Sequence, residues 1–85
     1  MNLEMESRAR VMMLSKMAQS YLNLRLYEDA LDHCNLALEI DKDEEEVKYI
    51  KAKVLSYLFK FKESIKLFKE NDHAKDVDWV EKLIA

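Results

Sequence analysis

The residue types that most often perform chemistry in proteins are sparse in this sequence. It contains one cysteine, Cys34, and two histidines, His33 and His73. Because His33 and Cys34 are adjacent, their side chains would point about 100° apart on a helix and cannot form a base–nucleophile pair. We therefore interpret Cys34 as a structural thiol rather than a nucleophile.

Metal and phosphate sites also find little support. His73 has no second histidine or cysteine at ligand spacing, so we expect it on the surface. The acidic run at residues 41–46 lacks the glycine and the alternating ligands of a calcium loop, and is better explained as the start of a helix. The chain has no glycine at all, which excludes a Gly-rich phosphate loop. We expect no enzyme activity, no catalytic residue, no metal and no cofactor.

The elements that carry these residues must be helices. The chain has 85 residues, 49% of them hydrophobic, but neither glycine nor proline. Average usage would give about 6 glycines and 4 prolines in this length, and sheets depend on both for their turns. The composition therefore predicts one all-α domain.

Charge and hydropathy exclude further classes of function. The net charge of −3 disfavours nucleic-acid binding, which requires a basic surface. No apolar run approaches the ~20 residues of a membrane span, and the first ten residues lack an apolar signal core. A single cysteine fits a reducing compartment, so we expect a cytoplasmic protein, with the nucleus as the alternative.

Hydrophobic spacing predicts five helices. The first begins near residues 4–7 and ends near Asn23, and a turn at residues 24–26 precedes a second that runs through Ile40. A capping box of Asp43 and Glu46 opens the third, a break near residues 59–60 opens the fourth, and a turn at residues 71–72 precedes the last. The predicted apolar face of the first helix is Leu14, Met17, Ala18, Tyr21 and Leu24, and that of the second is Tyr27, Ala30, Leu31, Ala37 and Leu38. The third helix contributes Val47, Ala52, Leu55 and Leu58, and the fourth Phe61, Ile65 and Phe68. The last helix contributes Ala74, Val77, Val80 and Ile84.

The chain is similar to itself at a shift of 34 residues. This shift aligns Ala18 with Ala52, Tyr21 with Leu55, Leu24 with Leu58, Tyr27 with Phe61, Ala30 with Ser64, Leu31 with Ile65 and Cys34 with Phe68. A shift of 36 aligns residues 20–22 with 56–58, but it places Leu24 on Lys60 and Tyr27 on Glu63. The 34-residue period is favoured because it keeps apolar residues on apolar residues.

A helix-turn-helix repeat of this length resembles the tetratricopeptide (TPR) family. Small residues at Ala18, Ala52, Ala30 and Ser64 would let the two helices of each hairpin approach closely. Residues 21–24, 27–31 and 37–41 are similar to the co-chaperone and immunophilin type of TPR. The resemblance implies an α-solenoid fragment: the start of the first helix at residues 1–10, repeats at 11–44 and 45–72, and a capping helix at 73–85.

The sequence departs from the family pattern in its turns. Arg25 and Phe59 stand where the hairpin glycine is usual, so we expect turns of non-glycine geometry, and Lys42 replaces the closing proline. The second repeat ends early, at residues 71–72. Because such arrays typically need about three repeats, the chain is a fragment of a longer protein, a homodimer, or a domain stabilised by its partner.

The resemblance implies that the first helix of each hairpin lines a concave groove that binds a peptide or helix of a partner protein. We expect tyrosines to anchor this ligand and lysines to bind a carboxylate. Of the clustered methionines, Met13 and Met17 are assigned to the core and only Met12 to the open side. The predicted groove residues are Met12, Ser15, Lys16, Gln19, Asn23, Glu46, Tyr49, Ile50, Lys53 and Tyr57.

Co-chaperone TPR domains often hold acidic chaperone tails in a clamp of Lys, Asn and Arg. In one register, the clamp positions are Ser15, Gln19 and Ile50, and in the other they are Lys16, Glu46 and Ile50. Neither register keeps the clamp, so a chaperone tail is the less favoured ligand.

Two alternatives to a peptide-binding adaptor stay open. One is a self-association domain, with Phe59, Phe61, Phe68 and Trp79 as its contact surface. The other is the TPR tail of a larger immunophilin-type peptidyl-prolyl isomerase, with a catalytic domain outside these residues.

Overall fold

The computed structural model describes residues 3–71 and 74–84, without the side chain of Ala74. Its elements are α1 (Leu3–Asn23), α2 (Tyr27–Ile40), α3 (Glu45–Tyr57), α4 (Phe61–Glu70) and α5 (Ala74–Ile84). No strand occurs in these two ranges, so the all-α prediction is confirmed. The predictions for Asp72, His73 and the Ala74 side chain lie outside the described residues.

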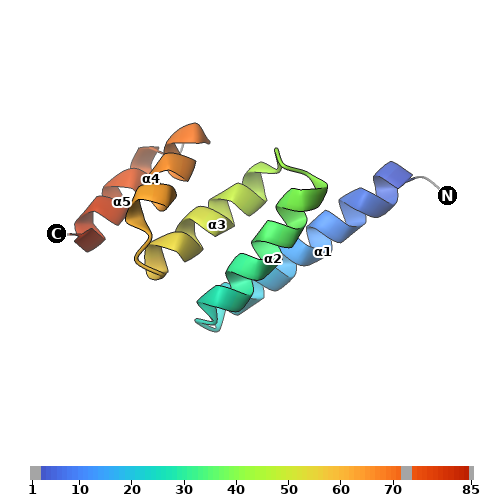
Figure 1. The fold of residues 1–85 in the computed structure, drawn as a ribbon, viewed down its shortest axis with the longest axis horizontal. Helices are drawn as coiled ribbons and strands as arrows, with labels where there is room; N and C mark the ends of the chain where they lie inside the picture. Colours follow the sequence, from blue (N-terminus) through green and yellow to red (C-terminus); the bar gives the residue numbers. More distant parts are fainter. Residues whose placement is uncertain (1–2, 72–73, 85) are drawn as a thin grey trace.

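The helices follow one another along an elongated molecule with Cα extents of 51 × 26 × 15 Å. The chain reverses after each helix, so that α1 and α2 form one hairpin and α3 and α4 form a second (Figure 1). Helices α1 and α5 lie toward opposite ends of the long axis. Helix α3 is central, since it packs against α2 and α4 and also contacts α1.

The two hairpin turns have the same backbone geometry. Arg25 and Phe59 both adopt a left-handed conformation with φ of 63°. In the first turn, the Leu26 N–H donates to the Tyr21 carbonyl at 2.9 Å, and in the second the Lys60 N–H donates to the Leu55 carbonyl at 2.9 Å. These are the bonds of a Schellman motif, which requires a left-handed residue and is usually formed by glycine. The expectation of non-glycine geometry was therefore wrong, because the motif is kept although the residue is not glycine.

Glycine at Arg25 is expected to stabilise the fold. A non-glycine residue in the left-handed region costs about 1–2 kcal/mol, and Arg25→Gly would remove this cost. Part of the gain is offset, because glycine makes the unfolded chain more flexible. We expect the free energy of unfolding in urea to rise by about 0.5–1 kcal/mol. Arg25→Ala is the matched control, since it removes the same side chain and keeps the backbone cost. Equal stability of the two variants would contradict this interpretation.

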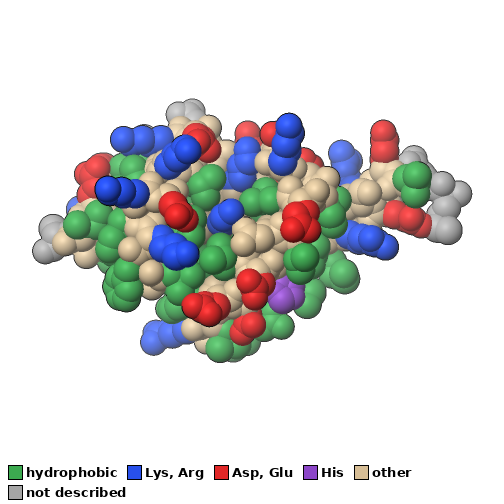
Figure 2. All heavy atoms as spheres, in the orientation of Figure 1, with side chains coloured by type: hydrophobic (Ala, Val, Ile, Leu, Met, Phe, Trp, Pro, Cys, Tyr) green, Lys and Arg blue, Asp and Glu red, His purple; other side chains and the backbone are tan. Residues whose placement is uncertain are grey.

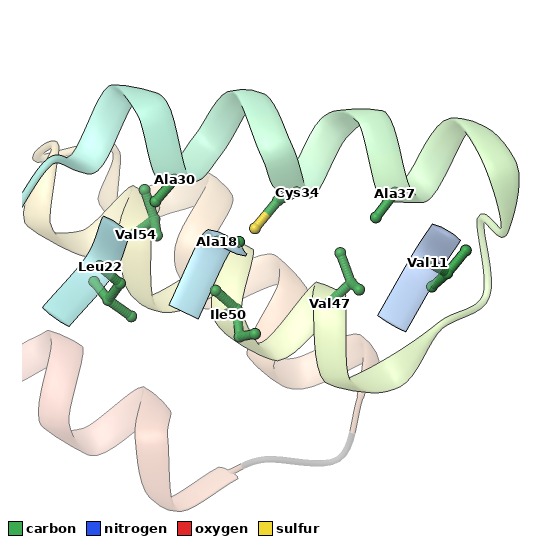
Figure 3. Close-up of a cluster of buried hydrophobic side chains, with 9 residues drawn as sticks. All are labelled: Val11, Ala18, Leu22, Ala30, Cys34, Ala37, Val47, Ile50 and Val54. Atoms are coloured by element: carbon green, nitrogen blue, oxygen red, sulfur yellow. The ribbon is translucent and has the colours of Figure 1, made fainter. Parts of the chain in front are cut away.

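Two clusters of buried side chains form the core. The first joins α1, α2 and α3: Ala30 lies against Val54, Cys34 faces Ala18 and Ile50, and Ala37 lies by Val47 (Figure 3). The second joins α3, α4 and α5 through Ala52, Phe68, Val77 and Val80. Because α3 contributes to both clusters, it links the two halves of the molecule.

The crossing of α3 and α4 is close. The Ser64 hydroxyl is fully buried and donates a hydrogen bond of 2.6 Å to the carbonyl oxygen of Ala52. A contact of this length between a side chain and a backbone carbonyl requires small residues on both helices. Ala18 and Ala30, one on each helix of the first hairpin, are also fully buried.

The predicted apolar face of α1 was wrong in part. Met17 is 37% exposed and Leu24 68% exposed, and Met13, also assigned to the core, is exposed. The buried residues of α1 are instead Val11, Ser15, Ala18 and Leu22. Both sets have helical spacing, so α1 is apolar on two sides, and α2 and α3 cover only one of them.

The predicted capping box also failed. Helix α3 begins at Glu45, and its N-cap residue Glu44 makes no side-chain cap hydrogen bond. The Asp43 N–H instead donates to Asp41 Oδ1 at 3.1 Å, an Asx-turn within the connection between α2 and α3. In α5, Val77 and Val80 are buried as predicted, but Ile84 is exposed at the end of the helix.

Candidate functional site

The reactive side chains Cys34 and His33 make their contacts within the fold. Cys34 is fully buried, and burial raises the pKa of its thiol to about 12, an effect that Lys51 opposes. His33 Nδ1 lies 2.7 Å from the Asp29 carbonyl oxygen, which can only accept, so this ring nitrogen is the donor. The imidazole also contacts the ring of Tyr21 at 4.8 Å. Within residues 3–71 and 74–84, no group of three or more His, Cys, Asp or Glu side chains could hold a metal ion.

The raised pKa of Cys34 predicts a loss of stability at alkaline pH. The folded chain retains the thiol proton between its ordinary pKa of 9.0 and about 12, whereas the unfolded chain releases it. This stabilising contribution is complete below pH 9 and falls by about 1.4 kcal/mol per pH unit above it. Urea denaturation at a series of pH values should therefore give a steeper decline for the wild type than for Cys34→Ala. The cost of the cavity in the variant is independent of pH, so parallel declines would contradict the assignment.

The α1 part of the predicted groove is accessible. Met12, Lys16 and Asn23 are exposed and Gln19 is half-buried. Gln19 Nε2 donates to Asn23 Oδ1 at 3.0 Å, which orients both amides one turn apart on the same side of the helix. The two amides leave further donor and acceptor positions for a polar ligand.

The α3 part of the groove centres on Lys53 and Tyr57. Lys53 Nζ lies 5.2 Å from the centroid of the Tyr49 ring, within the range of a cation–π contact. The Tyr57 ring stacks on Tyr27 with a centroid distance of 5.0 Å and meets the edge of Trp79 at 5.6 Å. Tyr57 is therefore held in place while part of its side chain stays exposed. Glu46 is exposed in the first turn of α3.

Tyr49 is partly used by the fold. Its hydroxyl donates to Asp76 Oδ1 of α5 at 3.3 Å, and its ring lies edge-on to Phe68 at 5.8 Å. Burial, and then the charge and hydrogen bond of Asp76, raise the pKa of this phenol. Tyr49 therefore contacts α5 and lies at the edge of the predicted groove.

Two predicted groove residues are not accessible. Ser15 is 5% exposed and Ile50 2% exposed, so neither can contact a partner. Ile50 packs with Ala18 and Cys34 in the first core cluster, between α1 and α2 (Figure 3). The Ser15 hydroxyl has no hydrogen-bond partner among the described residues. The predicted groove residues that are accessible are therefore Met12, Lys16, Gln19, Asn23, Glu46, Lys53 and Tyr57, and Tyr49 is half-buried. We call this set the accessible groove face.

Sequence reasoning missed the neighbours that hold the tyrosines. Tyr27 and Trp79 contact Tyr57, and Asp76 binds Tyr49. The 34-residue period gave no signal for Trp79 or Asp76, because α5 begins 29 residues after α3 and so does not follow it. The contact of Tyr27 with Tyr57 could have been found from the sequence. Tyr57 lies on the same helical stripe as Val47, Ile50 and Val54, which pack against α2, the helix that Tyr27 begins.

In the view of Figure 1, α2 lies in front of α1. Figure 2 shows acidic and basic side chains interspersed over the face seen in this view, with hydrophobic side chains between them.

Comparisons of the chain with models of known protein families, with characterised proteins and with solved structures found no match. Among the described helices, none has the length and apolar character needed to cross a bilayer. The function is therefore inferred from the geometry of the chain itself.

Proposed function

We propose that the face formed by α1 and α3 binds a peptide or helix of a partner protein, and that the chain is a non-enzymatic adaptor of the TPR type. The observation that carries this proposal is the accessible groove face itself. It combines a methionine, two lysines, two amides and a tyrosine on two helices that contact each other. Side chains of these kinds can bind both the apolar and the polar groups of a peptide.

The tyrosine supplies the strongest local support. Tyr57 is confined between Tyr27 and Trp79, so binding a ligand would cost it little conformational entropy. Rigid aromatic side chains that are partly exposed are common energetic centres of protein interfaces. Tyr57 is therefore the proposed anchor of the groove.

The charges favour a ligand with a carboxylate near the middle of the groove. Lys16 and Lys53 lie in the interior turns of α1 and α3, whereas the acidic Glu46 lies at the start of α3. The acidic tail of a chaperone remains less favoured, because Ser15 and Ile50, which occupy positions of the family's clamp, are buried.

Features that recur after 34 residues support the TPR part of the proposal. Helices α2 and α4 begin at Tyr27 and Phe61, and the left-handed residues Arg25 and Phe59 precede them by the same interval. Full burial of Ala18 and Ala52 follows the same period. The buried, unpaired Cys34 is compatible with a reducing compartment such as the cytoplasm.

The proposal is tested with a peptide selected from a displayed random library against the immobilised chain. We expect Lys53→Ala and Tyr57→Ala each to weaken binding of this peptide by about 5–30-fold in fluorescence anisotropy, as for residues at the centre of an interface. Lys66→Ala on the exposed part of α4 is the matched control and should leave the affinity unchanged. Circular dichroism and melting curves establish that the variants are folded. Unchanged affinity in both groove variants would refute the groove.

The aromatic self-association surface receives less support. Phe68 is fully buried, and Phe61 and Trp79 are half-buried in the second core cluster. Only Phe59 of the four is exposed, at 79%, and its ring lies against Phe61 at 5.9 Å. These aromatics mainly pack α3, α4 and α5 together. The isomerase-tail alternative depends on a catalytic domain outside these residues.

A further inference from the structure

The side of α1 that faces away from the core carries a hollow of about 670 Å³. The residues that line it are Ala9, Met12, Met13, Lys16, Met17, Ser20 and Tyr21. We call this the outer face of α1. Met13 and Met17 are exposed there, and they lie opposite the buried residues Val11, Ser15, Ala18 and Leu22 around the helix.

The same chain shows what covers the corresponding face of α3. The 34-residue period relates Met13 to Val47, Lys16 to Ile50 and Ser20 to Val54. Val47, Ile50 and Val54 are buried in the cluster to which α2 contributes Ala30, Cys34 and Ala37 (Figure 3). The outer face of α1 therefore corresponds to the face of α3 that α2 covers. In the first hairpin, no described helix covers this face.

The opposite end of the molecule is different. Helix α5 buries Val77 and Val80, whereas Lys75, Asp78, Glu81 and Lys82 are exposed, and Leu83 and Ile84 are exposed at the end of the helix. An outer surface that is mostly polar can end a helical array without a further partner. Within the described residues, the uncovered methionine surface lies at the α1 end of the array.

We propose that a second copy of this chain covers the outer face of α1, with the two α1 helices packed antiparallel about a two-fold axis near residue 15. Shape supports this pairing, because the axis places Met13 opposite Met17 of the second copy. It also places the small Ala9 opposite the large Tyr21 of the second copy. An isologous contact of this kind closes after two copies and leaves no further copy to be added.

Charge selects the antiparallel direction. Glu6 and Arg10 precede Met13 and Met17 on the same helical face, and Arg25 and Asp29 lie in the turn and first turn of α2 beyond its other end. Antiparallel packing about this axis pairs residue 6 with residue 24 of the second copy, which places Glu6 near Arg25 of the second copy. Parallel packing would place each of these charges beside its own equivalent, which is repulsive.

The size of the surface sets the expected affinity. Helix α1 has 21 residues and is therefore about 31 Å long. One face of a single helix of this length buries less than the ~800 Å² per partner of a standard interface. We therefore expect a weak dimer, with a dissociation constant of roughly tens of micromolar.

Sedimentation velocity from about 1 µM to about 1 mM covers this range. The wild type should shift from monomer to dimer, and Met13→Glu should weaken the dimer by at least about tenfold through a buried, unpaired charge. Leu83→Glu, at an exposed leucine of α5, is the control and should dimerise as the wild type does. Met13→Gln, which is uncharged, should weaken the dimer less than Met13→Glu.

A charge exchange tests the direction of packing. Glu6→Arg and Arg25→Glu should each weaken dimerisation about 3–10-fold, and the double variant should restore most of the loss. A double variant as weak as the two single changes combined would overturn the antiparallel arrangement. A monomer at about 1 mM, or a dimer that Met13→Glu leaves intact, would overturn the second copy as occupant. Binding of a foreign amphipathic helix to a monomeric chain through Met13 would do the same.

The dimer and the groove can fail separately. The two surfaces share Met12 and Lys16, which line the hollow and also belong to the accessible groove face. The tested residues lie outside this overlap, since Met13 is not part of the groove face and Lys53 and Tyr57 do not line the hollow. Loss of peptide binding in the Lys53 and Tyr57 variants therefore does not test dimerisation.

Discussion

Replacing Phe68 by alanine is expected to remove about 3–5 kcal/mol from the free energy of unfolding, the usual cost of deleting a buried aromatic ring. Phe68 is the largest fully buried side chain of the described chain, and it packs with Ala52, Val77 and Val80. A domain of this size has only about 4–13 kcal/mol of stability in total. The loss is therefore a large share of the total stability.

Phe59→Ala is the matched control for this prediction. Phe59 is 79% exposed and has the same chemistry, so its truncation should cost less than about 1 kcal/mol in urea denaturation. Hydrogen exchange adds a spatial readout, because amides of α4 and α5 should lose more protection in Phe68→Ala than amides of α1 and α2. Equal costs for the two phenylalanine variants would contradict the second core cluster.

Enlarging Ala18 to leucine is expected to cost about 1–3 kcal/mol by overpacking the contact between α1 and α2. Ala18 is fully buried and faces Cys34 of α2 and Ile50 of α3 (Figure 3). The extra side-chain atoms would have to displace α2, on which the first core cluster depends. The melting temperature should fall by several degrees, since about 1 kcal/mol corresponds to about 4–8 °C in a domain of this size.

Ala9→Leu provides the comparison on the same helix. Ala9 is exposed, and alanine and leucine have similar helix propensities, so this change should stay within about 0.5 kcal/mol of the wild type. The measurement is made at low micromolar concentration, where the proposed dimer is dissociated. A loss at Ala18 no larger than that at Ala9 would show that the two helices do not cross closely at this residue.

The positions of the helices were largely predictable from local signals. Apolar spacing and the breaks near Arg25 and Phe59 predicted the ends of α1 and α3 and the starts of α2 and α4 to within a residue or two. The backbone of the turns was not predictable from residue type, because glycine is the usual sign of a left-handed residue. At Arg25 and Phe59 the hydrogen bonds of the turn impose that geometry on other side chains. The start of α3 was predicted to within one residue, but its capping box was wrong, because the Asp43 N–H takes part in a turn with Asp41 and the N-cap residue is Glu44.

The errors within the candidate site have a tertiary cause. Helix α1 has apolar residues on two sides, and its sequence cannot show which side the other helices cover. Met17 was assigned to the core for this reason, whereas Ser15 and Ile50 were assigned to the surface. Lys16, Lys53 and Asn23 are polar, so their accessibility followed more directly from residue type. The contacts of α5 with Tyr49 and Tyr57 lie outside the repeat and could be found only in three dimensions.

The most direct test of the proposed function is to map where a selected peptide binds. Nuclear magnetic resonance spectra of the isotopically labelled chain, recorded during titration with this peptide, report which backbone amides change environment. We expect the largest changes on α1 and α3, around Lys16, Asn23, Lys53 and Tyr57. Changes concentrated on the exposed surfaces of α2 and α4, with the α1 and α3 signals unmoved, would contradict it.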